Sequence, residues 1–224
     1  FIQGQSIPTA AAHVADIRAQ AVAQGRRPED VKVITGMTVT VAATEAEAQA
    51  LRAEYEAVLG LDDAAVMFAG ITGIDLTGID PDTRVADLHT DLGQTLINRY
   101  ARTNPDIRVR AVLDQFRTKA IRGFQITGSP EQVADEIIAI VDGSGIDGIM
   151  LEPTFGGPAS YEAFIELVLP ILIERGRAGT PEGATLRERL SGSPRLAPTH
   201  RAHRLTATDA SAEASVTAPL AAAT

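Results

Sequence analysis

The chain has 224 residues, of which 45% are hydrophobic and 22% are charged, and its 29 acidic and 20 basic residues give a formal net charge of −9. This acidic balance argues against nucleic acid as a partner, because phosphate binding requires clustered Lys and Arg. The absence of cysteine excludes disulfides, thiolate zinc sites, iron–sulfur clusters and a cysteine nucleophile from this sequence, which fits a cytoplasmic enzyme.

The sequence opens at Phe1 without an initiator methionine, a signal peptide or an apolar run long enough to cross a bilayer. We therefore interpret it as part of a longer, soluble polypeptide with no membrane association. Its first three residues are typical of the end of a strand. The next segment predicts a helix that is capped by Thr9 and ends at Gly25, with an apolar face made of Ala10, Val14, Ile17 and Ala21.

Residues 31–41 form the clearest predicted strand, because β-branched residues alternate along it. One side carries Val31, Val33, Met37, Val39 and Val41, and the other carries Ile34, Gly36, Thr38 and Thr40. Thr44 and Glu47 then form a capping box, which predicts the start of a helix. One stripe of this helix carries Leu51, Tyr55 and Leu59.

Turn signals such as Asn104-Pro105 interrupt residues 61–122, so we interpret this segment as an insertion that is partly helical and partly loop. A strand is predicted at 124–127. The helix after it is capped by a box of Ser129 and Gln132 and has Pro130 at its first position.

Gly143 and Gly145 are expected to end that helix, and a further strand follows at 149–151. Pro153 ends the strand because proline cannot donate a ladder hydrogen bond. The last apolar helix contains Phe164, Leu167, Val168, Ile171 and Leu172. It is expected to kink at Pro170.

Helices that alternate with apolar strands predict parallel βαβ units, in which helices cover the sheet. The predicted fold class is α/β, specifically the C-terminal portion of a (β/α)8 TIM barrel with a partly helical insertion, because complete barrels need roughly 250 residues. Residues 1–60 are interpreted as barrel units: the end of strand 6, a helix, strand 7 and a helix. The insertion at 61–122 precedes the last βα unit and terminal helices at 123–190, and a disordered tail is predicted at 191–224.

Four segments of the chain resemble one enzyme family. They are the strand and loop at 145–151, the helix start at 127–136, the Gly-Ile-Asp-Leu-Thr-Gly-Ile-Asp run at 73–80 and the charged helix at 183–190. Their order and spacing are similar to the flavin-dependent monooxygenases of the bacterial luciferase-like superfamily, in the nitrilotriacetate and dibenzothiophene-sulfone monooxygenase branch. In that branch, 31–41 would correspond to the seventh strand and 145–151 to the eighth.

The resemblance implies a two-component chemistry. A separate NAD(P)H-dependent flavin reductase would supply reduced FMN, with which the barrel enzyme and dioxygen oxygenate a small organic substrate. Most contacts to FMN would come from strands upstream of Phe1, so the isolated chain is expected to be inactive, and no cofactor-binding or catalytic residue is assigned within it. The intact enzyme is expected to form a homo-oligomer.

Function in such barrels lies at the carboxyl ends of the strands. This predicts substrate contacts at Gly36, Met37 and Thr38, and at Glu152, Thr154 and Phe155. In related alkanesulfonate monooxygenases, the positions that correspond to Gly36 and Thr38 carry charged or imidazole groups that face the substrate. Arg122 falls where relatives have a mobile loop, which implies a cationic lid.

Each of these candidates also has a structural alternative. Gly36 could serve a close backbone approach, Glu152 could pair with a neighbouring Arg or Lys, and Arg122 could be a solvated loop residue. The run Phe155-Gly-Gly-Pro158 could be a loop that only connects the predicted strand to the helix that follows it. The four histidines form no catalytic triad by spacing, and no metal site is predicted. Two other functions stay open: a deazaflavin-dependent reductase of the same superfamily, or an inactive fragment that acts only as an interaction module.

Overall fold

The computed structural model describes residues 1–119, 123–153, 157–179 and 182–196, together with Pro198, His200 and Ala202. Residues Phe1–Ala178 form one compact unit, and the chain from Gly179 onward belongs to a second unit. The described part of the second unit contains helix α9 (Leu186–Ser191). No helix in the described ranges is both long enough and apolar enough to cross a membrane.

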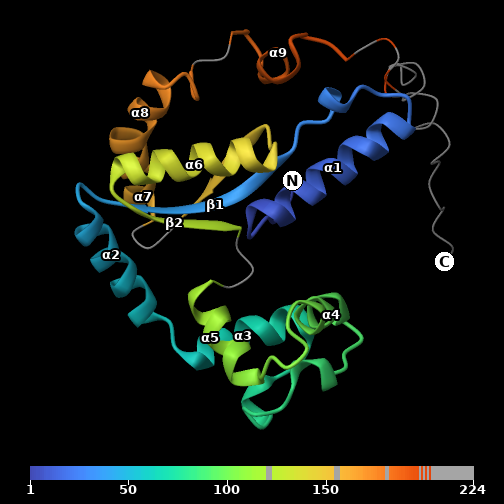
Figure 1. Cartoon of the computed structure of the whole chain (residues 1–224), viewed down its shortest axis with the longest axis vertical. Helices are drawn as coiled ribbons and strands as arrows, with labels where there is room; N and C mark the ends of the chain where they lie inside the picture. The colour runs from blue at the N-terminus through green and yellow to red at the C-terminus, as the bar shows by residue number, and fades with distance from the viewer. Residues whose placement is uncertain are drawn as a thin grey trace, which may run out of the picture. The chain divides into compact units, whose positions relative to one another are not determined.

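A parallel three-stranded sheet lies at the centre of the first unit (Figure 1). Its strands are β1 (Ile34–Val41), β2 (Phe124–Gly128) and β3 (Gly148–Glu152), and their spatial order is β2-β1-β3. At the start of the chain, Ile2 makes a single parallel bridge to Thr35, where the end of a strand was predicted. The predicted α/β class with parallel strands is therefore confirmed.

The strand order differs from that of a barrel. Consecutive strands are neighbours in a closed (β/α)8 barrel, so β3 would be expected beside β2, but here β3 pairs with β1. In a closed barrel β1 would likewise be paired on both edges, so the difference lies in which strand occupies the second edge of β1.

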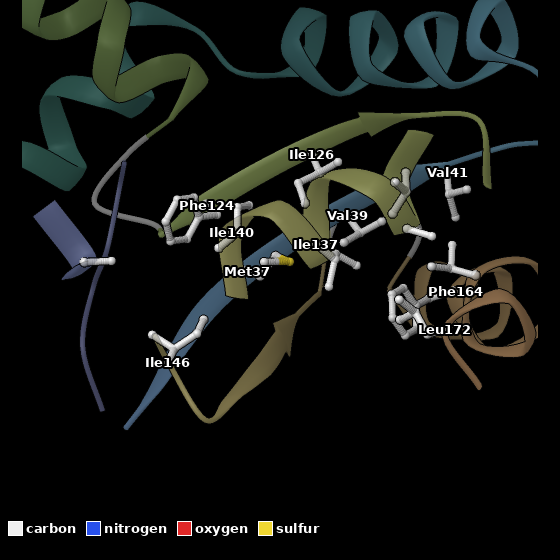
Figure 2. Close-up of a cluster of buried hydrophobic side chains, with 14 of the residues drawn as sticks. Met37, Val39, Val41, Phe124, Ile126, Ile137, Ile140, Ile146, Phe164 and Leu172 are labelled. Carbon is white, nitrogen blue, oxygen red and sulfur yellow. The ribbon is translucent and has the colours of Figure 1, made fainter. Parts of the chain in front are cut away.

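One face of the sheet packs against helices and forms the main hydrophobic core (Figure 2). Helix α6 (Pro130–Ser144) covers this face beside α1 (Ile7–Ala23). The odd-numbered residues of β1 point into this core, which confirms the predicted alternation. Figure 2 labels core side chains from the strands, from α6, from the segment between α6 and β3, and from the terminal helical region: Met37, Val39, Val41, Phe124, Ile126, Ile137, Ile140, Ile146, Phe164 and Leu172.

Local capping chemistry fixes most helix starts. The capping boxes of α2 (Glu45–Val58) and α6 are present as predicted, with Thr44 and Ser129 as caps. The cap predicted for α1 was wrong, because the Ser6 hydroxyl accepts from the backbone N–H of Thr9. Gly143 lies inside the last turn of α6 and does not end it; a Cβ there would approach Ile7 Cγ2 to 2.8 Å, so this glycine lets α1 pack closely.

The predicted stripe of α2 is only partly buried. Leu51 is 41% exposed, whereas Ala48 is fully buried and the side chain of Arg52 is 14% exposed. Helix α2 packs against β1 and β2 through this Ala48 and Arg52 face. The sequence pattern predicted that Leu51 faces the sheet, but in the structure Arg52 faces it.

The terminal helical region is divided into three pieces. Helix α7 (Pro158–Ala163) runs into a π-helical turn at Phe164–Val168, and α8 (Leu169–Glu174) follows. Pro170 lacks an N–H for the regular helical hydrogen bond, so the expected distortion occurs, as a π turn that precedes the proline. Phe164, Val168 and Leu172 are buried as predicted.

Residues 61–119 have a second hydrophobic core, separate from that of the sheet. The helical elements of this segment are α3 (Leu61–Thr72), the 3-10 turns Leu76–Gly78 and Val85–Asp87, α4 (Gln94–Thr103) and α5 (Val109–Thr118). Phe68 and Phe116 meet edge to face, with ring centroids 5.2 Å apart. The buried members of this second core are Ala64, Phe68, Leu76, Val85, Ile97, Ile107, Val109, Val112 and Phe116.

Candidate functional site

A row of three polar residues crosses the face of the sheet opposite the main core. Thr38 of β1 is in register with Gln125 of β2 on one side and with Glu152 of β3 on the other. Because registered residues in a parallel sheet point to the same face, their three side chains lie side by side. Glu152 is the last residue of β3, so this polar row reaches the carboxyl end of that strand.

Gly36 provides space for the Glu152 carboxylate. A Cβ built at Gly36 would overlap Oε1 of Glu152 and would lie 3.3 Å from Cζ of Phe1. The absence of a side chain therefore lets the carboxylate lie over β1. Gly123, just before β2, is also close to Gly36. A Cβ at Gly123 would overlap the Gly36 carbonyl oxygen, so the absence of a side chain at Gly123 lets its backbone approach the backbone of β1.

Two members of the polar row have unused hydrogen-bonding capacity. Thr38 is 4% exposed, and its Oγ1 has no hydrogen-bond partner among the residues that the structure describes. Within the same ranges, the half-buried Glu152 carboxylate makes no hydrogen bond or ion pair, so the ion pair considered for it is not seen there. A buried hydroxyl without a partner is costly in a folded protein, and such groups often mark a ligand or an ordered water.

The third member, Gln125, is already bonded. Its Oε1 accepts from Nη2 of Arg52 at 3.0 Å, and its Nε2 donates to the Lys119 carbonyl oxygen at 3.0 Å. Arg52 also donates to Glu56 Oε1 at 2.7 Å and to the Thr118 carbonyl oxygen at 2.6 Å. Its positive charge is therefore neutralised by Glu56, and its donors are directed toward the segment that leads into β2.

The structure brings three of the sequence-predicted residues together: Gly36, Thr38 and Glu152. Met37 lies on the opposite face, where it is 0% exposed in the main core. Arg122, Thr154 and Phe155 lie outside the described residues. Sequence reasoning missed Gln125 and Arg52. Alternation along β2 could have identified Gln125, because Phe124 and Ile126 occupy the other face.

The chain belongs to the bacterial luciferase-like monooxygenase family, whose pattern, described as "Luciferase-like monooxygenase", matches residues 1–179. Dimethyl-sulfide monooxygenase of Hyphomicrobium sulfonivorans is 31% identical over 196 residues, which are 86% of this chain and 40% of that protein. Nitrilotriacetate monooxygenase component A of Aminobacter aminovorans is 33% identical over 201 residues, which are 85% of this chain and 43% of that protein. Dibenzothiophene-sulfone monooxygenase of Rhodococcus erythropolis is 30% identical over 184 residues, which are 78% of this chain and 40% of that protein.

Solved structures give the same assignment. A riboflavin lyase, solved with modified FMN and riboflavin, has a TM-score of 0.80 and 37% identity over 91% of this chain and 45% of its own. DmoA from Hyphomicrobium sulfonivorans has a TM-score of 0.75 and 31% identity, with coverage of 91% and 44%. The chain thus spans less than half the length of these relatives, and the predicted family is confirmed.

The described residues do not fit the phosphate of FMN at the carboxyl end of the sheet. The N-terminus of α6 follows β2 there, but its box is closed: Ser129 Oγ accepts from the Gln132 N–H, and Gln132 Oε1 accepts from the Ser129 N–H. Arg52, the cation bonded to the polar row, is paired with Glu56. We therefore derive no flavin chemistry from these residues.

Proposed function

We propose that this chain is the C-terminal part of a two-component FMN-dependent monooxygenase. The intact enzyme takes reduced FMN from a separate NAD(P)H-dependent flavin reductase and uses dioxygen to oxygenate a small organic substrate. Membership of the family across residues 1–179 carries this proposal. Relatives named as monooxygenases support it, and so does the flavin in the riboflavin lyase structure.

We propose that residues 1–60 contain the end of strand 6, a helix, strand 7 and a helix of the barrel, and that residues 123–190 contain the last βα unit and the terminal helices. In this numbering β1 is the seventh strand and β3 the eighth, and their parallel pairing supports the proposal. Residues 61–122 remain the proposed insertion between two barrel strands, and their separate core supports this division.

In this proposal the polar row belongs to the substrate site. Gly36, Thr38 and Glu152 lie on one face of the sheet, and we propose that Arg122, Thr154 and Phe155 complete the site from the loops that follow α5 and β3. The flavin contacts are assigned to the remainder of the intact enzyme, which we propose to be a cytoplasmic homo-oligomer.

Flavin titration tests the proposal. The DNA upstream of the Phe1 codon is read, and the chain is expressed both alone and with any upstream open frame restored. The chain alone should bind FMN negligibly. The longer protein should bind reduced FMN and, with a flavin reductase, NADH and dioxygen, should convert at least one of dimethyl sulfide, dibenzothiophene sulfone or nitrilotriacetate.

Two results would favour the other functions. Binding of a deazaflavin in preference to FMN by the longer protein would favour the reductase. Failure of the longer protein to bind any flavin, together with capture of a specific protein by the chain alone, would favour an interaction module.

A further inference from the structure

The two hydrophobic cores of the first unit have no buried residue in common among the residues that the structure describes. The main core draws its residues from the strands, α1, α6, the terminal helical region and their connections, whereas every buried member of the second core lies within residues 61–119. Phe116, the last buried residue of α5, packs on Phe68 of α3. Apolar packing at the end of α5 therefore joins this helix to α3 rather than to the sheet.

Hydrogen bonds attach the carboxyl end of α5 to α2 and to β2. Nη2 of Arg52, on α2, donates to the carbonyl oxygen of Thr118 at 2.6 Å. Nε2 of Gln125, on β2, donates to the carbonyl oxygen of Lys119 at 3.0 Å. The last carbonyl groups of an α-helix have no partner within the helix, so these two side chains cap α5 from other elements. The α5 joint consists of Arg52, Gln125, Thr118 and Lys119.

One nitrogen atom of Arg52 connects the two sides of the α5 joint. Nη2 donates to Thr118 and also, at 3.0 Å, to Oε1 of Gln125. The rest of the guanidinium is held in place, because Nε donates to Oε1 of Glu56 at 2.7 Å and Cζ lies 5.3 Å from the ring centroid of Tyr55. The side chain of Arg52 is only 14% exposed, so water does not fully replace the partners that a displaced guanidinium loses. The bonds of Nη2 to Thr118 and to Gln125 are therefore made or lost together.

We propose that Arg52 is a positioning residue that couples segment 61–119 to the polar row. Gln125 belongs to this row and is in register with Thr38. While α5 is in place, Arg52 and the Lys119 carbonyl group hold both polar atoms of the Gln125 amide. When α5 is displaced, both partners leave the amide, and the row loses a fixed side chain. The main core lies on the other face of the sheet and is not part of this coupling, which does not depend on the proposed function.

NMR signals of the Gln125 side-chain amide test the coupling on the full chain, and Gln125→Leu assigns them by their disappearance. Phe68→Ala changes the second core, to which Gln125 does not belong. In Phe68→Ala the amide signals should move to the positions that they take in Arg52→Met, because both substitutions release Gln125. Val66→Ala is a control on the same helix, at a residue that is 72% exposed, and should leave the signals unchanged. Unchanged Gln125 signals in Phe68→Ala, with α5 unprotected from hydrogen exchange, would overturn the inference.

Hydrogen exchange at the last turn of α5 tests the coupling in the reverse direction. Gln125→Leu should speed this exchange about 5-fold and Arg52→Met about 10-fold or more, because hydrogen bonds of charged groups contribute more than neutral ones. The double variant should exchange no faster than Arg52→Met alone, since either substitution opens the same joint. Thr127→Val is the matched control: Thr127 is half-buried on the same face of β2, and its substitution should leave α5 unchanged.

Three outcomes of the exchange experiment would also overturn the inference. They are no effect of Gln125→Leu on α5, an equal effect of Thr127→Val, and effects that multiply in the double variant, which would mean that Arg52 and Gln125 hold α5 independently. Circular dichroism checks that the variants are folded. If Arg52→Met does not fold, the movement of the Gln125 signals in Phe68→Ala and the comparison of Gln125→Leu with Thr127→Val decide the inference.

Discussion

Phe68→Ala should unfold the segment 61–119 locally and leave the main core intact. Phe68 is 0% exposed and packs edge to face on Phe116 in the second core. Truncating a buried phenylalanine to alanine costs about 3–5 kcal/mol, including the cavity that remains. A core within a segment as short as residues 61–119 rarely provides more than about 3–5 kcal/mol, so this one substitution should remove nearly all of its local stability.

Hydrogen exchange measured by mass spectrometry can read the two cores separately. Amides of α3 and α5 should lose protection by roughly 100-fold or more, because each 1.4 kcal/mol is a factor of ten. Amides of β1 and α6 should keep theirs. Val66→Ala is the matched control, since Val66 lies on the same helix and is 72% exposed. Equal loss of protection in β1 and α6 would refute the independence of the two cores.

Two further substitutions test single interactions. Arg52→Lys should speed hydrogen exchange at the backbone amides around Thr118 and lower the local stability there by about 1–3 kcal/mol, because lysine cannot make the three directed hydrogen bonds of the guanidinium. The control Arg102→Lys changes an exposed arginine and should leave this exchange unchanged. A similar increase in exchange in both variants would contradict the role of Arg52. The hydroxyl and backbone N–H of Thr77 hold the pKa of the Asp75 carboxyl below its ordinary value of 3.8. These hydrogen bonds to the ionised Asp75 carboxyl stabilise the fold at pH values above the unfolded-state pKa, and their contribution is lost as the pH falls through the folded-state pKa. Thr77→Val should therefore raise the pKa of Asp75 toward 3.8 and weaken the turn at residues 75–77 at pH values above 3.8. An unchanged pKa in an NMR titration would rule out the hydroxyl as its main cause.

Local signals in the sequence predicted the helices and strands well. The capping boxes at Thr44 and Ser129 depend only on residues three positions apart, and alternation along β1 depends only on the pleat. Pro170 marked the helix distortion for the same reason, because a missing N–H acts within one turn. Such signals can be read without knowledge of distant contacts.

Contacts between distant segments could not be predicted in the same way. Leu51 and Arg52 are neighbours in sequence, and only the packing of α2 against β1 and β2 decides that arginine is the more buried of the two. The order β2-β1-β3 likewise depends on pairing between segments that are far apart in the chain. Gly36 and Glu152 were each candidates, but their steric fit becomes visible only when β1 and β3 are paired.

The two faces of β1 differ in how completely they are covered. The odd-numbered face is buried beneath α6, whereas on the other face Ile34 and Met150 remain 37% and 43% exposed around the polar row. Parallel sheets in soluble proteins are normally covered on both faces. In the proposed barrel the second face is the interior, so the rest of the enzyme would bury Ile34 and Met150 and strengthen the field of Glu152 by excluding water. The side chains of Ile34 and Met150 should therefore be less exposed in the longer protein than in this chain, and equal exposure there would contradict the assignment of this face to the interior.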